Sequence, residues 1–243
     1  MAVKAESALD TVTEGLERLM AAHPVLRLLL ERRSCRKWLE RPVPDDLVLA
    51  ILEAGRWAPS AGNFQPWHFV VAEDRESLAR ITRVADESKN LSRIWAPYFR
   101  EGERRGYIID FRSVPLCIAI FADPRHAPPH VDGNLHHIVG AALALQNMWL
   151  AAEALGLGAC CWSNMQQDKM KAIFGVPHHY YFLAVLGIGY VDGDGSPDGY
   201  AIDRSYWQRK PLSDVVGWGW YRAKRGEEPP HEQRECLRRN LGL

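Results

Sequence analysis

The stretch PSAGNFQPWHFVVAED, residues 59 to 74, joins a polar bend to a short apolar run. Pro, Gly and Asn in residues 59 to 66 are typical of a turn, whereas HFVVA, residues 68 to 72, has the β-branched and aromatic side chains of a strand. Ligand contacts are often placed on a loop that is fixed to a rigid strand, although most such loops only connect elements. The stretch therefore predicts a buried strand and raises the question of what the bend contacts.

Helices and short strands alternate on both sides of this stretch. Apolar residues at helical spacing predict helices over residues 9–33 with a break at Pro24, 45–54 with Asp45 as the cap, 75–86, 89–103, 135–155 and 167–174. Short apolar runs predict further strands over residues 116–121, 159–162 and 181–190. This order predicts an α+β fold, with helices packed on a small central sheet.

The composition is that of a globular chain with balanced charge. Its 243 residues are 47% hydrophobic, and 30 basic residues match 30 acidic ones. Balanced charge gives no reason to expect a nucleic acid or an anionic membrane as the main partner. The sequence has no long uncharged apolar window, and its N-terminus lacks the apolar core of a secretory signal. We therefore expect no membrane segment, a cytoplasmic location and a small-molecule partner.

Several common functional patterns are missing from the sequence. The five cysteines have no CxxC spacing, which argues against a disulfide framework and a zinc site and favours buried thiols. The motifs GxSxG, HExxH and a strand-linked GxGxxG are absent. The segment DGDGSPDGYAID, residues 192–203, has Pro197 where a calcium loop needs glycine. We expect no metal site.

The segment ERRSCRK, residues 31–37, gathers several basic side chains at the end of a predicted helix. Guanidinium groups present planar donor forks that match phosphate oxygens, and a serine hydroxyl adds a compact donor. A phosphate monoester is therefore one interpretation of this cluster, and a solvated charged face is the other. Arg209 and Lys210 form a second basic pair, which either closes on the same phosphate or lies in a surface turn.

The C-terminal tail is rich in large aromatic side chains but has little periodicity of its own. Trp207, Trp218, Trp220 and Tyr221 need a place to be buried. Two places are open on sequence grounds, the surface of the same monomer and that of a partner subunit.

Four segments in order together resemble the FMN-dependent nitroreductase family. They are ERRSCRKW (31–38), PVPDDLVLAILEAGRWAPSAGNFQPWHFVV (42–71), ALQNMWLAAEALGLGACCWS (144–163) and QRKPLSDVV (208–216). The resemblance implies a nitroreductase-like fold, with a small mixed or antiparallel sheet flanked by helices. It also implies an intertwined homodimer in which the C-terminal segment embraces the partner. On this basis we expect an N-terminal helical extension at 1–27, an FMN-binding domain at 28–216 and a tail at 217–243.

The resemblance also implies roles for individual residues. Arg32, Arg33 and Ser34 would contact the phosphate and ribityl chain of FMN, and Arg36 would stabilise the reduced flavin electrostatically from its pyrimidine end. A second phosphate contact would come from Arg209 and Lys210. The loop that meets the flavin bound mainly by the other subunit would comprise Pro59, Ser60, Ala61, Asn63 and Gln65. The stretch passing the flavin ring, with a backbone N–H offered to its N5 atom, would comprise Cys161, Trp162, Ser163 and Asn164, where several relatives have a glycine.

The implied activity is that of an oxidoreductase. NAD(P)H would be the reductant, and a nitroaromatic, a quinone or a similar small acceptor would be reduced in a ping-pong cycle. The same scaffold hosts flavin fragmentation and reductive dehalogenation, so these remain alternatives, as does an FMN carrier without turnover. Residues 88–112 correspond to a variable region that often forms a substrate lid, and a solvated helix is the other interpretation.

Overall fold

The computed structural model of the protein describes residues 13–91, 111–129, 135–195, 209–210 and 215–216. The chain divides into two units, residues 28–202 and residues 1–27 with 203–243. Helices α2 (Thr13–Ala22) and α3 (Pro24–Glu31) are separated at His23, as the sequence predicts. Pro24 begins α3, where its missing N–H costs no helical hydrogen bond. The predicted division into three segments stays a prediction.

The larger unit is built on a four-stranded antiparallel sheet. Its strands are β1 (Trp67–Ala72), β2 (Leu116–Ala122), β3 (Gly158–Trp162) and β4 (Tyr181–Gly189), in the order β1-β2-β4-β3. This arrangement confirms the predicted α+β class and every predicted strand to within one residue at each end. The antiparallel alternative of the predicted mixed or antiparallel sheet is the one observed.

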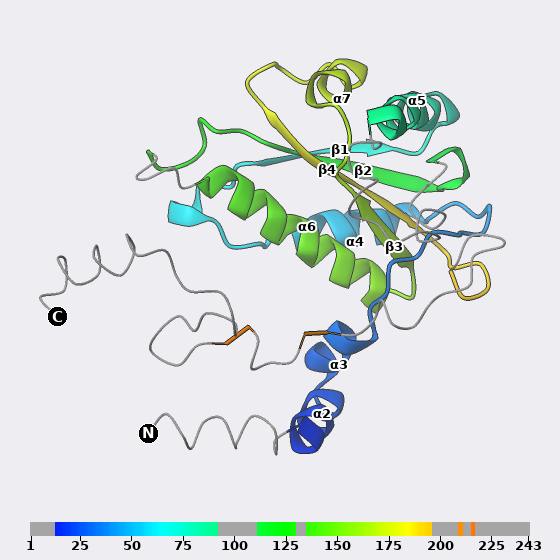
Figure 1. Ribbon diagram of the computed structural model, residues 1–243, viewed down its shortest axis with the longest axis vertical. Coiled ribbons are helices and arrows are strands. Elements are labelled where there is room, and N and C mark those ends of the chain that lie inside the picture. The colour runs from blue at the N-terminus through cyan, green and yellow to red at the C-terminus, as the bar shows by residue number, and fades with distance from the viewer. Residues whose placement is uncertain (1–12, 92–110, 130–134, 196–208, 211–214, 217–243) are drawn as a thin grey trace, which may run out of the picture. The chain divides into compact units, whose positions relative to one another are not determined.

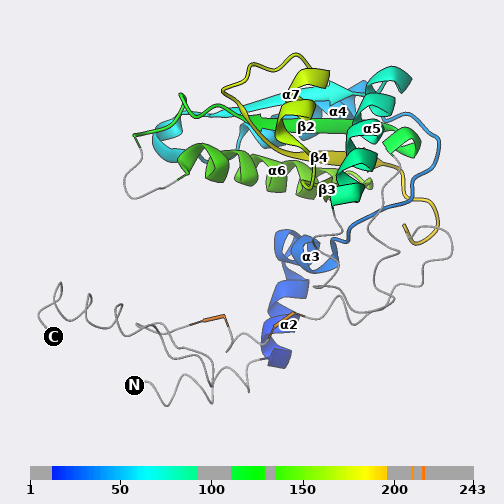
Figure 2. The same cartoon turned by 45° about the horizontal axis from the view of Figure 1, so that its top comes forward.

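Helices cover both faces of this sheet. Figures 1 and 2 show α4 (Asp45–Arg56) and α6 (His136–Ala154) on one face, and α5 (Arg75–Leu91) and α7 (Gln167–Ile173) on the other. A short 3-10 helix, η4 (Phe111–Ser113), lies against α5.

Strand β2 is buried along its whole length because both of its faces are covered. Leu116, Ile118 and Ile120 pack into the core that includes α4 and α6, whereas Cys117 and Phe121 pack into the core that includes α5 and α7. The alternation of side chains along one strand thus serves two separate cores.

Two details of the predicted helices were wrong. Asp45 does not cap α4; Pro44 occupies the N-cap position with extended backbone and no side-chain cap, and the Asp46 carboxylate accepts from the Leu47 N–H at 3.0 Å. Helix α5 continues to Leu91 rather than ending at residue 86. The helix predicted over 89–103 falls mostly outside the described residues.

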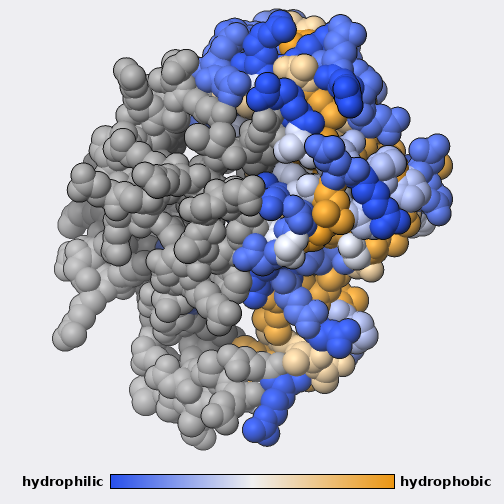
Figure 3. Space-filling view, turned by 90° about the vertical axis from the view of Figure 1, so that its right-hand side faces the viewer, coloured by the Kyte–Doolittle hydropathy of each residue, from blue (hydrophilic) through white to orange (hydrophobic). Residues whose placement is uncertain are grey.

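Hydrophobic side chains reach the surface of the described chain in several places. Figure 3 shows one side on which they lie between hydrophilic residues. Single exposed apolar residues are ordinary in globular proteins. No helix among the described residues has both the length and the apolar character needed to span a bilayer.

Candidate functional site

The predicted phosphate-binding segment is held against the free edge of strand β3. Ser34 pairs with Ala159 of β3, and the Cys35 N–H donates to the Ala159 carbonyl at 3.0 Å. The next residue, Arg36, donates its backbone N–H to the carbonyl of Gly195 at 2.8 Å. Backbone hydrogen bonds to a sheet fix the path of this segment, so its side chains leave a rigid base.

Buried side chains on both flanks of the arginines anchor the same segment. Cys35 and Trp38 are each 5% exposed, and the Trp38 indole N–H donates to the Gly158 carbonyl at 2.9 Å. A Cβ at Gly158 would lie 2.7 Å from the Cβ of Cys35, so only glycine lets the segment approach β3 this closely. In the segment ERRSCRKW, the buried side chains of Cys35 and Trp38 therefore anchor the backbone, and the arginine side chains are left available to a ligand.

The three arginines of this segment have different surroundings. The Arg32 guanidinium is half-buried and lies 4.4 Å above the ring of Trp149 in α6. Arg33 is exposed, and its Nη1 donates to the carbonyls of Leu30 at 2.6 Å and Arg32 at 2.8 Å. Arg36 is half-buried, with its Nη1 3.4 Å from the Ser34 carbonyl. Arg32 is thus the guanidinium that other elements of the fold support most.

Glu153 of α6 lies beside these arginines, although the sequence analysis did not single it out. Its carboxylate accepts a hydrogen bond from the Arg33 backbone N–H. Burial raises the pKa of Glu153, and the positive charges of Arg32 and Arg33 and this hydrogen bond act in the opposite direction. Trp149 and Glu153 are four residues apart and so share one face of the helix, but their spacing does not show that this face meets Arg32.

The loop before β1 is held in an unusual backbone conformation. Three residues of the loop have a positive φ angle. These angles are 56° at Gly62, 57° at Asn63 and 49° at Gln65. Asn tolerates this left-handed region, but Gln rarely adopts it, so the backbone is strained. The Ser60 hydroxyl accepts from the Gln65 N–H at 2.9 Å and closes the turn. Strain of this kind is concentrated at functional sites.

The same loop presents its polar side chains to solvent. Asn63 and Gln65 are exposed, as are Pro59 and Phe64, whereas Ser60 and Ala61 are half-buried. The loop lies against the N-terminal half of α6, because a Cβ at Gly140 would lie 3.1 Å from Pro66 and 3.4 Å from Ser60.

The predicted flavin-facing stretch follows the end of β3. Cys161 and Trp162 are half-buried, whereas Ser163 and Asn164 are exposed. Asn164 is not among the described non-glycine residues with positive φ. The backbone here therefore does not need the glycine that several relatives carry.

The predicted site residues can be placed relative to one another by the part of helix α6 that each group contacts. The arginine segment and the end of β3 lie together, because Ser34 pairs with Ala159, two residues before Cys161. The loop instead contacts Gly140, nine residues before Trp149, which corresponds to about 14 Å along a helix. Within one chain the two halves of the predicted site thus touch different ends of α6.

Arg209 and Lys210 are exposed and belong to the other unit, so their predicted phosphate contact stays a prediction.

The cysteines near the site are not activated nucleophiles. Burial raises the pKa of Cys35 to about 11 and of Cys161 to about 12, and it also raises that of Cys160. A thiol in this state is protonated at neutral pH. All four cysteines within the described ranges are free; Cys35, Cys117 and Cys160 are buried, as predicted, whereas Cys161 is half-buried.

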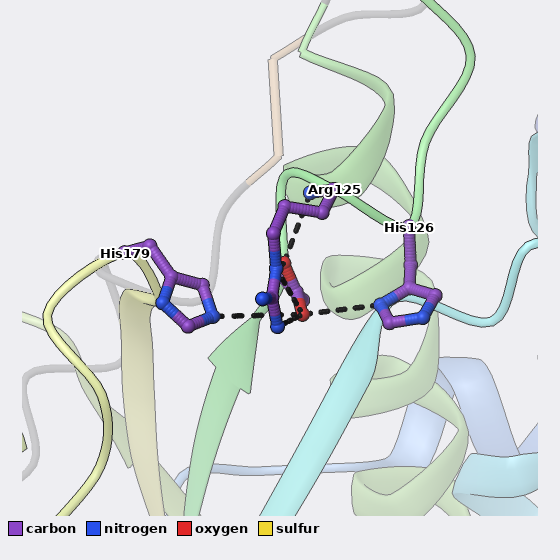
Figure 4. A network of polar contacts seen from close by, with 4 residues as sticks. Arg125, His126 and His179 are labelled. Carbon is purple, nitrogen blue, oxygen red and sulfur yellow. Dashed lines mark hydrogen bonds and ion pairs between the residues drawn. The ribbon is translucent and has the colours of Figure 1, made fainter.

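A second polar cluster lies just behind the loop. The Asp123 N–H donates to the Pro66 carbonyl at 2.7 Å, and the Asp123 side chain is only 2% exposed. Figure 4 shows this carboxylate between Arg125, His126 and His179, at N···O distances of 2.7, 3.1 and 3.8 Å. Hydrogen bonds from Arg125 hold the pKa of Asp123 well below its usual range. Among the residues that the structure describes, no cluster of His, Cys, Asp and Glu could hold a metal ion.

Comparison with known proteins gives one family. The sequence matches the profile of the nitroreductase family over residues 29–190. A protein of Methanothermobacter thermautotrophicus, named for candidate NADH dehydrogenase and NAD(P)H nitroreductase activities, is 30% identical over 209 residues, which cover 82% of this chain and 94% of that protein. The 5,6-dimethylbenzimidazole synthase of Rhodospirillum rubrum is 29% identical over 191 residues, or 76% of this chain and 89% of the synthase.

A solved structure agrees with this match. The crystal structure of a candidate nitroreductase from Desulfovibrio desulfuricans in complex with FMN superposes with a TM-score of 0.60 at 26% identity. The superposition covers 80% of this chain and 95% of that one.

Proposed function

The chain belongs to the nitroreductase family, and from this membership we propose that it binds FMN and is an NAD(P)H-dependent oxidoreductase acting on small electron acceptors. The acceptors we propose are nitroaromatics, quinones and similar small molecules.

The observation that carries the FMN proposal is the rigid presentation of the arginine segment. Arg32, Ser34 and Arg36 project from backbone that is hydrogen-bonded to β3 and to Gly195. Guanidinium forks and a hydroxyl on a fixed base suit a phosphate monoester and the polar ribityl chain next to it. The donor set of Arg32, Arg33 and Ser34 therefore suits the phosphate and ribityl chain of FMN. We propose Arg209 and Lys210 as the second basic contact.

We further propose that the complete site needs a second copy of the chain. The loop residues Pro59 to Gln65 contact one end of α6 and the arginine segment contacts the other end. Between and beside these contacts, the N-cap residue Leu135 and the α6 residues Val139 and Leu143 are exposed, with exposed fractions of 53%, 56% and 40%. An apolar row on a helix favours burial against a partner, and a twofold axis across α6 would bring each loop to the partner's arginine segment.

When bound, FMN supplies the redox chemistry, since it accepts a hydride and passes electrons on. The chain binds and orients the cofactor and tunes its surroundings. Arg36 would place a positive charge at the pyrimidine end, where negative charge develops on reduction. The end of β3, from Cys161 to Asn164, would offer a backbone N–H beside the ring. No protein side chain is required as acid or base.

The proposed cycle is ping-pong, with NAD(P)H leaving in its oxidised form before the acceptor binds. The similarity to a 5,6-dimethylbenzimidazole synthase favours a second candidate, oxidative fragmentation of the flavin itself. Reductive dehalogenation and an FMN carrier without turnover are further alternatives on this scaffold. Homodimer formation and a cytoplasmic location complete the proposal.

An absorbance spectrum of the purified full chain tests the proposal. We expect a flavin band that bleaches on anaerobic addition of NADPH or NADH and returns when a nitroaromatic or a quinone is added. A band that persists with both nucleotides would contradict the reductase and favour the synthase or the carrier. A chain that shows no flavin band, even after incubation with FMN, would contradict cofactor binding itself.

A further inference from the structure

The Arg32 guanidinium is supported from below by an aromatic ring. Its central carbon lies 4.4 Å from the centroid of the Trp149 ring, and both side chains are half-buried. Of the aromatic rings, that of tryptophan attracts a cation most strongly, and partial burial strengthens the attraction. The pair of Arg56 and Trp57 differs, because both of its side chains are exposed to solvent.

The Trp149 indole is not explained by packing alone. Its Nε1 atom is buried and has no hydrogen-bond acceptor in the part of the chain that the structure describes. Burying an unpaired donor costs free energy, and a leucine or phenylalanine would fill this space without that cost. The face that the indole offers to Arg32 accounts for its presence.

Glu153 completes the surroundings of Arg32. It lies one helical turn after Trp149, and its carboxylate interacts with the charge of Arg32 while accepting from the Arg33 N–H. The guanidinium thus lies over a ring with a carboxylate nearby. The contact with the ring and the attraction of the carboxylate charge limit the motion of the guanidinium before any ligand arrives.

We infer that Trp149 is a positioning residue that holds the Arg32 guanidinium in place for a phosphate monoester, and that it thereby makes the site prefer FMN over riboflavin. This inference rests on the proposed function, namely that the arginine segment binds FMN. A guanidinium that is already held in place loses less side-chain freedom when it binds the phosphate. Riboflavin has no phosphate and gains nothing from that arrangement.

Flavin titrations of the apoprotein test this inference. Quenching of flavin fluorescence gives the Kd of FMN and of riboflavin for the wild type, Trp149→Leu and Trp149→Phe. We expect Trp149→Leu to weaken FMN binding about tenfold, to leave riboflavin binding unchanged, and Trp149→Phe to recover most of the loss. Trp149→Met, which is also not aromatic, replaces the leucine variant if that variant does not fold.

A double-mutant cycle shows whether Trp149 acts through Arg32. We expect Trp149→Leu combined with Arg32→Gln to bind FMN no more weakly than Arg32→Gln alone, because the ring then has no guanidinium to hold. Tyr190→Leu is the matched control, since the Tyr190 ring lies 3.9 Å from Arg41, which is not one of the predicted cofactor residues. This control should leave the ratio of the two flavin Kd values unchanged.

Each other outcome has a distinct meaning. Equal weakening of FMN and riboflavin by Trp149→Leu, or independent losses in the double variant, would overturn the positioning role. So would unchanged FMN affinity in Trp149→Leu. A wild-type chain that binds neither flavin would instead refute the proposed function.

Discussion

The arginine segment and the loop before β1 are two regions fixed by different physical means. The arginine segment carries charge on backbone that is bonded to the edge of β3. The loop from Pro59 to Gln65 carries no charged residue and is shaped by three residues with positive φ, closed by a Ser60 hydrogen bond. One region is suited to electrostatic binding, and the other to close contact by backbone and amide groups. The difference indicates a site assembled from two unlike halves.

The two halves also contact different ends of α6, and we propose that they meet only in a dimer. The first prediction therefore breaks this dimer and measures whether flavin is still bound. Val139→Asp places a charge on the exposed apolar row of α6. Because burying an unpaired charge in an apolar interface is costly, we expect a monomer and complete loss of bound flavin. Light scattering and the flavin absorbance measure these two results on the same sample.

Tyr181→Asp serves as the control for this variant. Tyr181 is 44% exposed at the start of β4 and is not part of the exposed apolar row of α6, so its substitution should leave both mass and flavin content unchanged. A Val139→Asp protein that is monomeric yet retains its flavin would place both halves of the site in one chain.

The second prediction concerns the charged half alone. Arg32→Gln should weaken FMN binding on the order of a hundredfold, because a charge-assisted hydrogen bond to the phosphate is lost. Arg33→Gln should have a smaller effect, since the Arg33 guanidinium donates to the carbonyls of Leu30 and Arg32. Titration calorimetry on the apoproteins gives both affinities. Equal losses in the two variants would show that the surroundings of the guanidiniums do not decide their contribution.

The charged half of the site was predictable from the sequence, because its basic side chains are neighbours in the segment ERRSCRK. The buried Cys35 in the middle of this segment separates arginine residues whose side chains are left available to a ligand. The helices and strands were predictable as well, since α6 and β2 are apolar over nearly their whole length, which is typical of elements covered on several sides. The start of α5 at residue 75 was predicted correctly, but its end was placed too early, because polar residues near a helix end carry little periodic signal.

The other half was only partly predictable. PSAGNFQP indicates a turn, but the positive φ of Gln65 arises from how Ser60 and Gly140 close the loop on α6, which no local pattern encodes. Trp149 and Glu153 were overlooked because an apolar helix read by itself gives no hint of which residues face Arg32. Such contacts between distant segments depend on the tertiary fold.

The third prediction tests the strained half. Gly62→Ala forces a side chain into the left-handed region and places its Cβ 2.8 Å from the Phe64 ring. We expect a loss of about 1–2 kcal/mol in the free energy of unfolding and weaker FMN binding. Urea denaturation and flavin titration measure these two effects.

Gly175→Ala is the matched control for the loop. Gly175 also has a positive φ, of 64°, but its Cβ would meet nothing within 4 Å. We expect a similar loss of stability with unchanged FMN affinity, because Gly175 lies after α7 and outside both halves. If both variants weaken FMN equally, the loop has no special part in binding.

The smallest expected effect concerns the support behind the loop and depends on pH. Hydrogen bonds from Arg125 lower the pKa of Asp123, and burial of the carboxyl only partly opposes them. A carboxyl whose pKa is lowered on folding stabilises the protein above its unfolded pKa of about 3.9, and this contribution is lost as the pH falls below that value. Since Arg125 is 62% exposed and therefore screened by water, we expect Asp123→Asn to cost only about 1 kcal/mol at neutral pH.

Thermal unfolding of the wild type and Asp123→Asn between pH 7 and pH 3 checks this prediction. The difference in Tm should be largest near neutral pH and should shrink below about pH 4, where the carboxyl becomes protonated in the unfolded chain while it stays ionised in the folded protein. A constant difference would mean that the charge of Asp123 adds nothing to its hydrogen bonds.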